Sequence, residues 1–259
     1  MQSKINLIDK IIILLLPILA AIISFIFHVN AFWSVLLFFV VPSIYLSFRS
    51  PKQIKRILTF SAFASVPVII MVDYIAHVSR QWLIPHSVLH FRMFGLVTIE
   101  VIIWALFNFY FVIIFYKHFL DRAYFKKLLP SRMLNMLILI VSLMIAFIVT
   151  YIFAPEKLNI PYFYLWFGLI IILIPIVIEF SQYPKVISKF FITACYFFYV
   201  SFLYEVTALK LDWWLFPNST FIGQVNIFGV NFPFEEMFFW LILFSMACLT
   251  AFERFDESS

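Results

Sequence analysis

The chain is poor in the residues that soluble proteins and nucleotide-binding enzymes depend on. Only 12% of its 259 residues are charged and 65% are hydrophobic, against about 25% and roughly 45–50% in soluble domains. Its four glycines form no phosphate loop or dinucleotide fingerprint. Its two cysteines lie in apolar runs and do not have the spacing of a metal site. The composition indicates an integral membrane protein, and we expect no cofactor and no bound metal.

Hydrophobic runs long enough to cross a membrane recur along the whole chain. A spanning helix needs about 20 apolar residues. The candidate spans are 10–28, 31–48, 57–78, 96–116, 133–153, 161–181, 187–208 and 233–251. We therefore predict an all-α integral membrane protein with about eight transmembrane helices in one compact membrane domain.

Lysine and arginine are unevenly divided between the two sides of these spans. With eight spans, 14 of the 18 basic residues fall on the side of the termini, and only Arg80, Arg92, Lys157 and Lys210 fall on the other. Because cytoplasmic loops carry the excess of basic residues, we predict that both termini are cytoplasmic. The net charge of +5 follows from this topology, so we expect no nucleic-acid partner.

Two stretches of the chain repeat the same order of acid, tryptophan, glycine and glutamate. The matching pairs are Asp73–Trp82 and Glu205–Trp214, nine residues apart, and Glu100–Trp104 and Glu236–Trp240, four residues apart. We therefore predict two copies of a four-span unit, 1–125 and 126–259. An even number of spans per copy makes the repeat parallel, with its site expected where the copies meet.

Carboxylates in or beside the predicted spans are the candidate catalytic groups. They are Asp73, Glu100, Glu205, Glu235 and Glu236. A carboxylate in hydrocarbon is costly and usually has a function or a partner. Clustered carboxylates in a low dielectric cannot all ionise, so one site can offer a general acid and a general base. The alternative is that the adjacent pair, which follows Pro233 in the first turn of a helix, caps that helix and faces the headgroups.

Aromatic side chains near these acids are the candidates for binding a substrate. They are Trp82, Trp104, Trp214, Trp240 and Phe239. A desolvated cation over a ring face gains about 2 kcal/mol or more. Trp104 and Trp240 lie one helical turn beyond a glutamate on the same face, which favours a cavity. Trp82 and Trp214 are equally compatible with an interfacial aromatic belt.

Two histidines have the spacing of a helical metal pair. His86 and His90 stand four residues apart, but Asn218 takes the place of His86 in the second copy. No glutamate follows His86 directly, as the common zinc motif requires. We interpret both as polar interfacial residues.

The second stretch resembles a known motif. The order acid, Trp-x-x-Pro, Phe-Gly and Pro-x-Glu-Glu is similar to the lycopene cyclase domain family of membrane carotenoid cyclases. The resemblance is clearest over 204–244, especially 232–239, and recurs weakly over 73–104. The first copy departs from it, because Glu100 is preceded by no proline. The resemblance implies an isomerase in a bacterial or archaeal cell membrane, which acts without a cofactor.

The implied reaction is the cyclisation of an acyclic ψ end group of a lycopene-type carotenoid. An acid protonates the terminal alkene, the next alkene attacks the tertiary cation, and a base removes a proton to leave a β- or ε-ring. Glu235 or Glu236 would be the acid or base, with Glu100 and Glu205 as partners and Asp73 as a tuner. The implied partners are a long apolar polyene taken from the bilayer, membrane lipid and other carotenoid-pathway enzymes.

Other functions are compatible with the same pattern. Parallel repeats and carboxylates in the membrane also suit a proton-coupled transporter. Another isoprenoid-modifying membrane enzyme would need a similar acidic and aromatic site. In a non-catalytic assembly protein, the acids would form hydrogen bonds between helices. With the predicted topology, the acidic site lies toward the outer leaflet.

Overall fold

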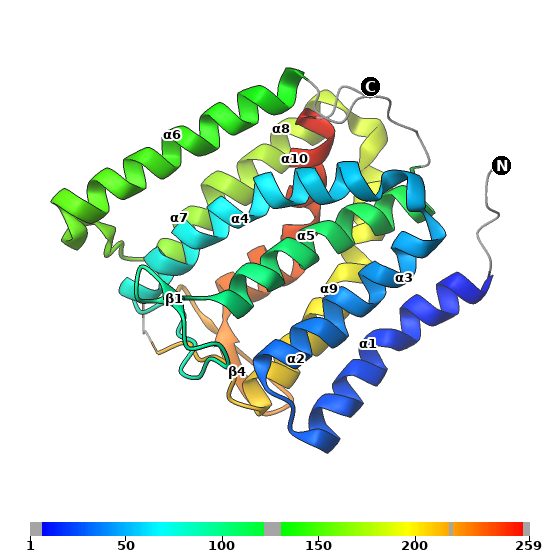
Figure 1. The fold of residues 1–259 in the computed structure, drawn as a ribbon, viewed down its shortest axis with the longest axis horizontal. Helices are drawn as coiled ribbons and strands as arrows, with labels where there is room; N and C mark the ends of the chain where they lie inside the picture. Colours follow the sequence, from blue (N-terminus) through cyan, green and yellow to red (C-terminus); the bar gives the residue numbers. More distant parts are fainter. Residues whose placement is uncertain (1–6, 122–130, 218–219, 256–259) are drawn as a thin grey trace.

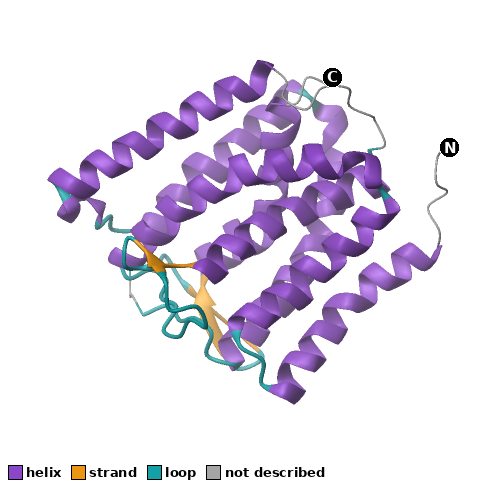
Figure 2. Cartoon of the chain, in the orientation of Figure 1, coloured by secondary structure: helices purple, strands orange, loops and turns teal. Residues whose placement is uncertain are grey.

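The computed structural model describes residues 7–121, 131–217 and 220–255. In these ranges eight helices are long and apolar enough to cross a membrane, which confirms the prediction of an all-α membrane protein (Figures 1 and 2). The spans are Leu7–Phe27, Ala31–Arg49, Pro51–Val78, Ile99–Phe119, Met133–Phe153, Phe163–Gln182, Pro184–Lys210 and Glu236–Phe255.

Five of the eight spans are built around one α-helix, and the other three contain a π-helical turn. The five are α1 (Leu7–Phe27), α4 (Ile54–Val78) after the 3₁₀ turn η2 (Pro51–Gln53), α5 (Ile99–Phe119), α6 (Ser131–Phe153), and α9 (Ile187–Lys210) after the 3₁₀ turn η5 (Pro184–Val186). The three are α2 (Ala31–Val35) with η1 (Leu36–Val40) and α3 (Val41–Arg49), α7 (Phe163–Phe167) with η4 (Gly168–Leu173) and α8 (Ile174–Gln182), and η6 (Glu236–Leu243) with α10 (Phe244–Phe255). A further 3₁₀ turn, η3 (Pro155–Leu158), follows α6.

Two of the π-helical turns lie immediately before a proline. Val41 donates its N–H to the carbonyl of Leu36, five residues back, and Pro42 follows. The same arrangement precedes Pro175 in the sixth span. Because proline has no N–H to donate, it interrupts the regular hydrogen-bond ladder of a helix, and such interruptions bend helices. Each of these two spans therefore contains a wide turn just before its proline.

Two short β-hairpins, which the sequence analysis did not predict, precede the fourth and eighth spans. Strand β1 (Arg92–Met93) pairs with β2 (Val97–Thr98), and β3 (Gln224–Ile227) pairs with β4 (Val230–Pro233). Both turns contain a Phe-Gly pair with positive φ. In the second hairpin this pair is the whole two-residue loop, which requires such backbone geometry, whereas the loop of the first hairpin has Leu96 as a third residue. A β-bridge between Leu83 and Leu215 joins the loops that lead into the hairpins.

Pro233 differs from its prediction. It is the last residue of β4 and lies opposite Gln224, so it precedes the helix and is not part of its first turn. Glu236 does lie in the first turn of the span, as predicted. The hairpin ends where the helix begins, which fixes the direction in which the first helical side chains point.

Several local features recur at matching places in the two halves of the chain. They are the π turns before Pro42 and Pro175, the 3₁₀ turns that begin at Pro51 and Pro184, the Phe-Gly hairpins, and the positive φ angles of His28 and Tyr162 and of Arg80 and Asp212. This agreement supports the predicted repeat of 1–125 and 126–259. The boundary between the copies lies outside the described residues, and the symmetry of the halves stays a prediction.

Helix α5 lies at the centre of the bundle and packs against α3, α4, α9 and α10 (Figure 1). Its run from Phe111 to Ile114 has no solvent exposure. Helices α6 and α1 lie at opposite edges of the bundle, where they pack against α4 and α9 respectively. Both hairpins and their loops (79–98, 211–217 and 220–235) lie at one end, called the hairpin end below (Figure 2).

Ion pairs gather at the end of the bundle away from the hairpins. Asp9 of α1 pairs with Arg49 of α3 at 2.9 Å, and Asp121, just after α5, pairs with Lys117 and with Lys189 of α9. Burial raises the pKa of the Asp121 carboxyl, but the hydrogen bond from Lys117 and the charge of Lys189 outweigh burial and hold that pKa below its usual range. These pairs tie the starts and ends of four spans together.

Candidate active site

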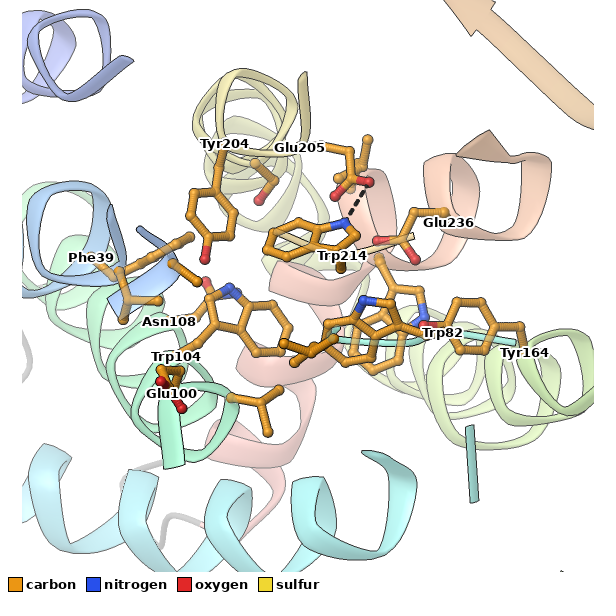
Figure 3. Close-up of a pocket in the computed structure, with 17 residues that line it drawn as sticks. Phe39, Trp82, Glu100, Trp104, Asn108, Tyr164, Tyr204, Glu205, Trp214 and Glu236 are labelled. Atoms are coloured by element: carbon orange, nitrogen blue, oxygen red, sulfur yellow. Dashed lines mark hydrogen bonds between the residues drawn. The ribbon is translucent and has the colours of Figure 1, made fainter. Parts of the chain in front are cut away.

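A cavity of about 50 Å³ lies inside the bundle near the hairpin end (Figure 3). It is lined by α2, η1 and α5 of the first half, by α7, α9 and η6 of the second, and by the loops that carry Trp82 and Trp214. Residues from both halves of the chain therefore line this cavity. One water needs about 10–15 Å³ of such volume, so the cavity fits a few waters, and a bulkier ligand requires it to open.

Glu205 of α9 and Glu236 of η6 are the two carboxyl groups that meet in this cavity. Glu205 is 2% exposed, and its Oε1 accepts a hydrogen bond of 3.1 Å from Nε1 of Trp214. Within the described residues, Glu236 makes no side-chain hydrogen bond, and it interacts electrostatically with Glu205. Two carboxyl groups this near in a low dielectric cannot both carry charge without a large cost. The arrangement suits a pair that shares one proton.

Tyr164 of α7 is a cavity residue that the sequence analysis missed. It is 2% exposed and interacts electrostatically with Glu236, Asp73 and Glu205. Its ring centroid lies 6.0 Å from that of Trp240. No motif or spacing singles it out, because it is one of 12 tyrosines and lies within an apolar run.

Four tryptophans form a continuous aromatic wall along the cavity. Trp82 contacts Trp214 and Trp104, with ring centroids 6.0 and 6.3 Å apart, and Trp104 contacts Trp240 at 6.3 Å. All four line the cavity. Trp214 is only 8% exposed and holds a carboxyl group, which is not the environment of an interfacial belt. The wall combines rings from both halves of the chain.

Glu100 and Glu235 hold the loops at the hairpin end. The carboxylate of Glu100 accepts hydrogen bonds from Ser87 Oγ at 2.9 Å, Val88 N at 2.6 Å and Leu89 N at 3.2 Å. The Oε1 of Glu235 accepts one from Ile222 N at 2.8 Å. Each glutamate therefore binds a loop residue 13 positions earlier in the chain. Glu100 borders the cavity, but its oxygens are occupied by this loop.

The π turn explains why only the second half places a further acid in the cavity. Trp104 follows the loop-binding Glu100 by four residues, whereas Trp240 follows the loop-binding Glu235 by five. A π turn holds one residue more than an α turn, so both tryptophans still reach the cavity. The extra residue in this turn is Glu236. By its spacing to the following tryptophan, Glu100 corresponds to Glu236 of the second half. By its hydrogen bond to a loop, Glu100 corresponds to Glu235.

Three predicted site residues do not line the cavity: Glu235, Asp73 and Phe239. Asp73 is 3% exposed within α4, where Arg92 and Tyr164 are its electrostatic neighbours. Phe239 is 3% exposed and packs against Gly168, where an added Cβ would lie 2.2 Å from the phenylalanine ring. Gly168 thus allows η4 and η6 to approach closely, and Phe239 takes part in helix packing.

The two histidines that we interpreted as polar interfacial residues are not on a helix. His86 and His90 lie in the irregular loop between α4 and β1. Among the described residues, no group of three or more histidine, cysteine, aspartate or glutamate side chains could hold a metal ion. We therefore build no chemistry on these histidines.

Comparisons with known proteins were made at the level of families, sequences and structures. No family model, curated protein or solved structure matches this chain. The chemistry of this chain is therefore indicated by its own cavity, where two carboxyl groups face an aromatic wall within the spans.

Proposed function

We propose that this chain is a carotenoid cyclase that converts an acyclic ψ end group of a lycopene-type polyene into a β- or ε-ring without net redox change. One observation carries the proposal: Glu205 and Glu236 meet in a cavity that is walled by four tryptophans and enclosed by membrane-spanning helices. This combination suits proton transfer to an apolar substrate. The resemblance of residues 204–244 to the lycopene cyclase domain family agrees with it.

The two carboxyl groups have different surroundings, which assigns them different roles. Glu236, which has no hydrogen-bond partner among the described side chains, donates the proton to the terminal alkene. The next alkene then attacks the tertiary cation and closes the ring. Glu205, held in place by Trp214, removes a proton from the ring. A proton passing from Glu205 to Glu236 restores the starting state, so the reaction consumes no cofactor.

The tryptophan wall suits the cationic intermediate. A cation over a desolvated indole face gains about 2 kcal/mol or more, and Trp82, Trp104, Trp214 and Trp240 all present rings to the cavity. The enclosed setting also keeps bulk water from the cation. A solute pathway usually needs a more polar lining, so this environment favours a cyclase over a proton-coupled transporter.

The substrate must enter a cavity that is closed around it. A carotenoid end group exceeds the about 50 Å³ that the structure holds open, so the spans separate when the polyene enters from the bilayer. With the topology predicted from lysine and arginine, both termini are cytoplasmic and the cavity lies toward the outer leaflet. Membrane lipid and other carotenoid-pathway enzymes are the expected partners.

Expression in a lycopene-accumulating bacterium tests the proposal. We expect lycopene to be replaced by a cyclic product of the same mass. Glu236→Gln should abolish that product, whereas Glu156→Gln should not, because Glu156 is an exposed acid in η3 that does not line the cavity. Unchanged lycopene in cells whose membranes contain the protein would refute cyclisation of lycopene by this chain alone.

A further inference from the structure

The cavity has a second polar group of side chains that ring closure does not use. Asn108 of α5 is 2% exposed and borders the cavity, and its Oδ1 has no hydrogen-bond partner within the described part of the chain. Ser201 and Tyr204 of α9 line the same cavity. In Figure 3, Asn108 and Tyr204 lie on one side of the view, and Glu236 and Tyr164 lie on the other.

An asparagine is an unexpected part of this aromatic wall. A buried carbonyl oxygen without a partner costs about 1–3 kcal/mol. The second half has Phe244 four residues after Trp240, where the first half has Asn108 four residues after Trp104. Phe244 stacks on Trp104 with centroids 6.1 Å apart, so an aromatic ring completes the wall on that side. The amide of Asn108 therefore points to a ligand that forms hydrogen bonds.

The volume and chemistry of this group fit water. A buried water needs about 10–15 Å³ and two to four polar partners. The cavity has about 50 Å³, and the three side chains supply an amide and two hydroxyl groups. These groups are uncharged and can both donate and accept, which suits a neutral water molecule better than an ion.

We propose that Asn108, Ser201 and Tyr204 hold a water that adds to the tertiary cation, so that the enzyme also hydrates the ψ end group to a tertiary alcohol. This proposal rests on the proposed function, because it uses the same acid and the same cation. Here the substrate is an acyclic alkene end, and water is the second reactant.

The hydration step balances without an oxidant or a cofactor. The π electrons of the terminal alkene form a C–H bond with the proton of Glu236, which leaves the positive charge on the tertiary carbon. A lone pair of the water oxygen forms the C–O bond. The oxygen then loses one proton, which returns to the carboxyl pair. The product equals the substrate plus one water, and the acid is regenerated.

The acid and the water lie on different sides of the cavity, and this arrangement favours anti addition of the proton and the oxygen to the alkene. The proton arrives from the side of Glu236, and the oxygen arrives from the side of Asn108. Ring closure competes for the same cation, because the next alkene attacks the same carbon. Asn108, Ser201 and Tyr204 therefore control the ratio of alcohol product to ring product. An apolar residue at position 108 should shift that ratio toward the ring product.

Isotope labelling tests the proposal. Membranes that contain the chain are incubated with lycopene in water enriched in ¹⁸O. The products are then separated, and their molecular masses are measured by mass spectrometry. We expect a ring product with the mass of lycopene and an alcohol heavier by one labelled water. Asn108→Leu and the milder Ser201→Ala should each lower the alcohol-to-ring ratio by about tenfold, the effect of one lost hydrogen bond.

Thr193→Val provides the matched control on the same helix as Ser201 and Tyr204. Thr193 is fully buried, bonds the carbonyl of Lys189 at 3.0 Å and does not line the cavity, so its replacement should leave the ratio unchanged.

The outcomes separate this proposal from the proposed function. A ring product with no alcohol overturns hydration and leaves the cyclase standing. An alcohol without a ring supports hydration and overturns ring closure. The absence of both products overturns both. An alcohol that lacks the label overturns the assignment of a bound water to Asn108, Ser201 and Tyr204. An alcohol-to-ring ratio that neither Asn108→Leu nor Ser201→Ala changes overturns it as well.

Discussion

Glu100 and Glu236 each precede a cavity tryptophan by four residues, yet we expect their glutamine variants to fail in opposite ways. Glu100 accepts hydrogen bonds from one hydroxyl and two backbone N–H groups of the 87–89 loop. Glu236 bonds no described side chain and lies in the cavity beside Glu205. Glu100→Gln should therefore reduce stability, whereas Glu236→Gln should reduce turnover.

The magnitudes follow from these contacts. A hydrogen bond to a charged acceptor contributes about 1.5–3 kcal/mol. Glutamine keeps one oxygen acceptor but turns an NH₂ group toward the loop, so Glu100→Gln should cost about 2–3 kcal/mol. In a chain of this size that lowers the melting temperature by about 5–10 °C. Glu236→Gln removes no hydrogen bond to a described side chain, so it should leave the melting temperature nearly unchanged. It should lower turnover by about 10²–10⁴-fold, the contribution of a general acid.

The two effects are measured on the same preparations. Each variant is purified in detergent and heated, and the folded fraction is followed by size-exclusion chromatography. Turnover is measured as ring product per mole of folded protein at a temperature where both variants are folded. A Glu100→Gln protein as stable as the parent would refute the loop-binding role. Full activity of Glu236→Gln would refute its role as proton donor.

Three other substitutions give further expectations. Gly168→Ala should lower the free energy of unfolding by about 1–3 kcal/mol, because its Cβ would lie 2.2 Å from the ring of Phe239; equal stability in the same heating assay would contradict this close packing. Trp214→Phe keeps a ring but removes the donor to Glu205, so turnover should fall while the chain stays folded; unchanged turnover would remove this hydrogen bond from the mechanism. The pKa of Asp121 is lowered on folding, so its stabilisation is present above its unfolded pKa of about 4 and is lost as pH falls through the lower folded value. Asp121→Asn should therefore flatten the decline of the unfolding midpoint in acid, and parallel curves for the two proteins would oppose this assignment.

The eight spans could be predicted because long apolar runs follow directly from the thickness of a bilayer. A proline within a span interrupts the hydrogen bonds of a helix, but the residues around Pro42 and Pro175 do not specify a π turn. The two hairpins were missed because their strands have two or four residues and carry little periodic signal. The Phe-Gly pairs were visible as part of the repeat, and their positive φ angles are what make them turns.

The candidate site was predicted in part, and the errors have a physical cause. Residue type and spacing identified the four tryptophans and the acids Glu205 and Glu236. They did not separate Glu235 from Glu236, because the direction of adjacent side chains depends on the hairpin and the π turn. Tyr164 and Asn108 lie in apolar runs without a motif. Their presence in the cavity depends on how helices from the two halves pack.

The π turn at the start of the last span has a consequence for the predicted repeat of two four-span units. Two identical four-span units would each use their glutamate to hold a loop, and such a pair would have aromatic walls but no unoccupied acid at η6. One inserted residue in one copy is sufficient to supply it, because the wider turn absorbs the insertion and keeps the neighbouring tryptophan in place. The fused chain can carry this difference between its halves, whereas a homodimer of one gene product cannot. The acid at η6 therefore depends on two halves that differ in sequence.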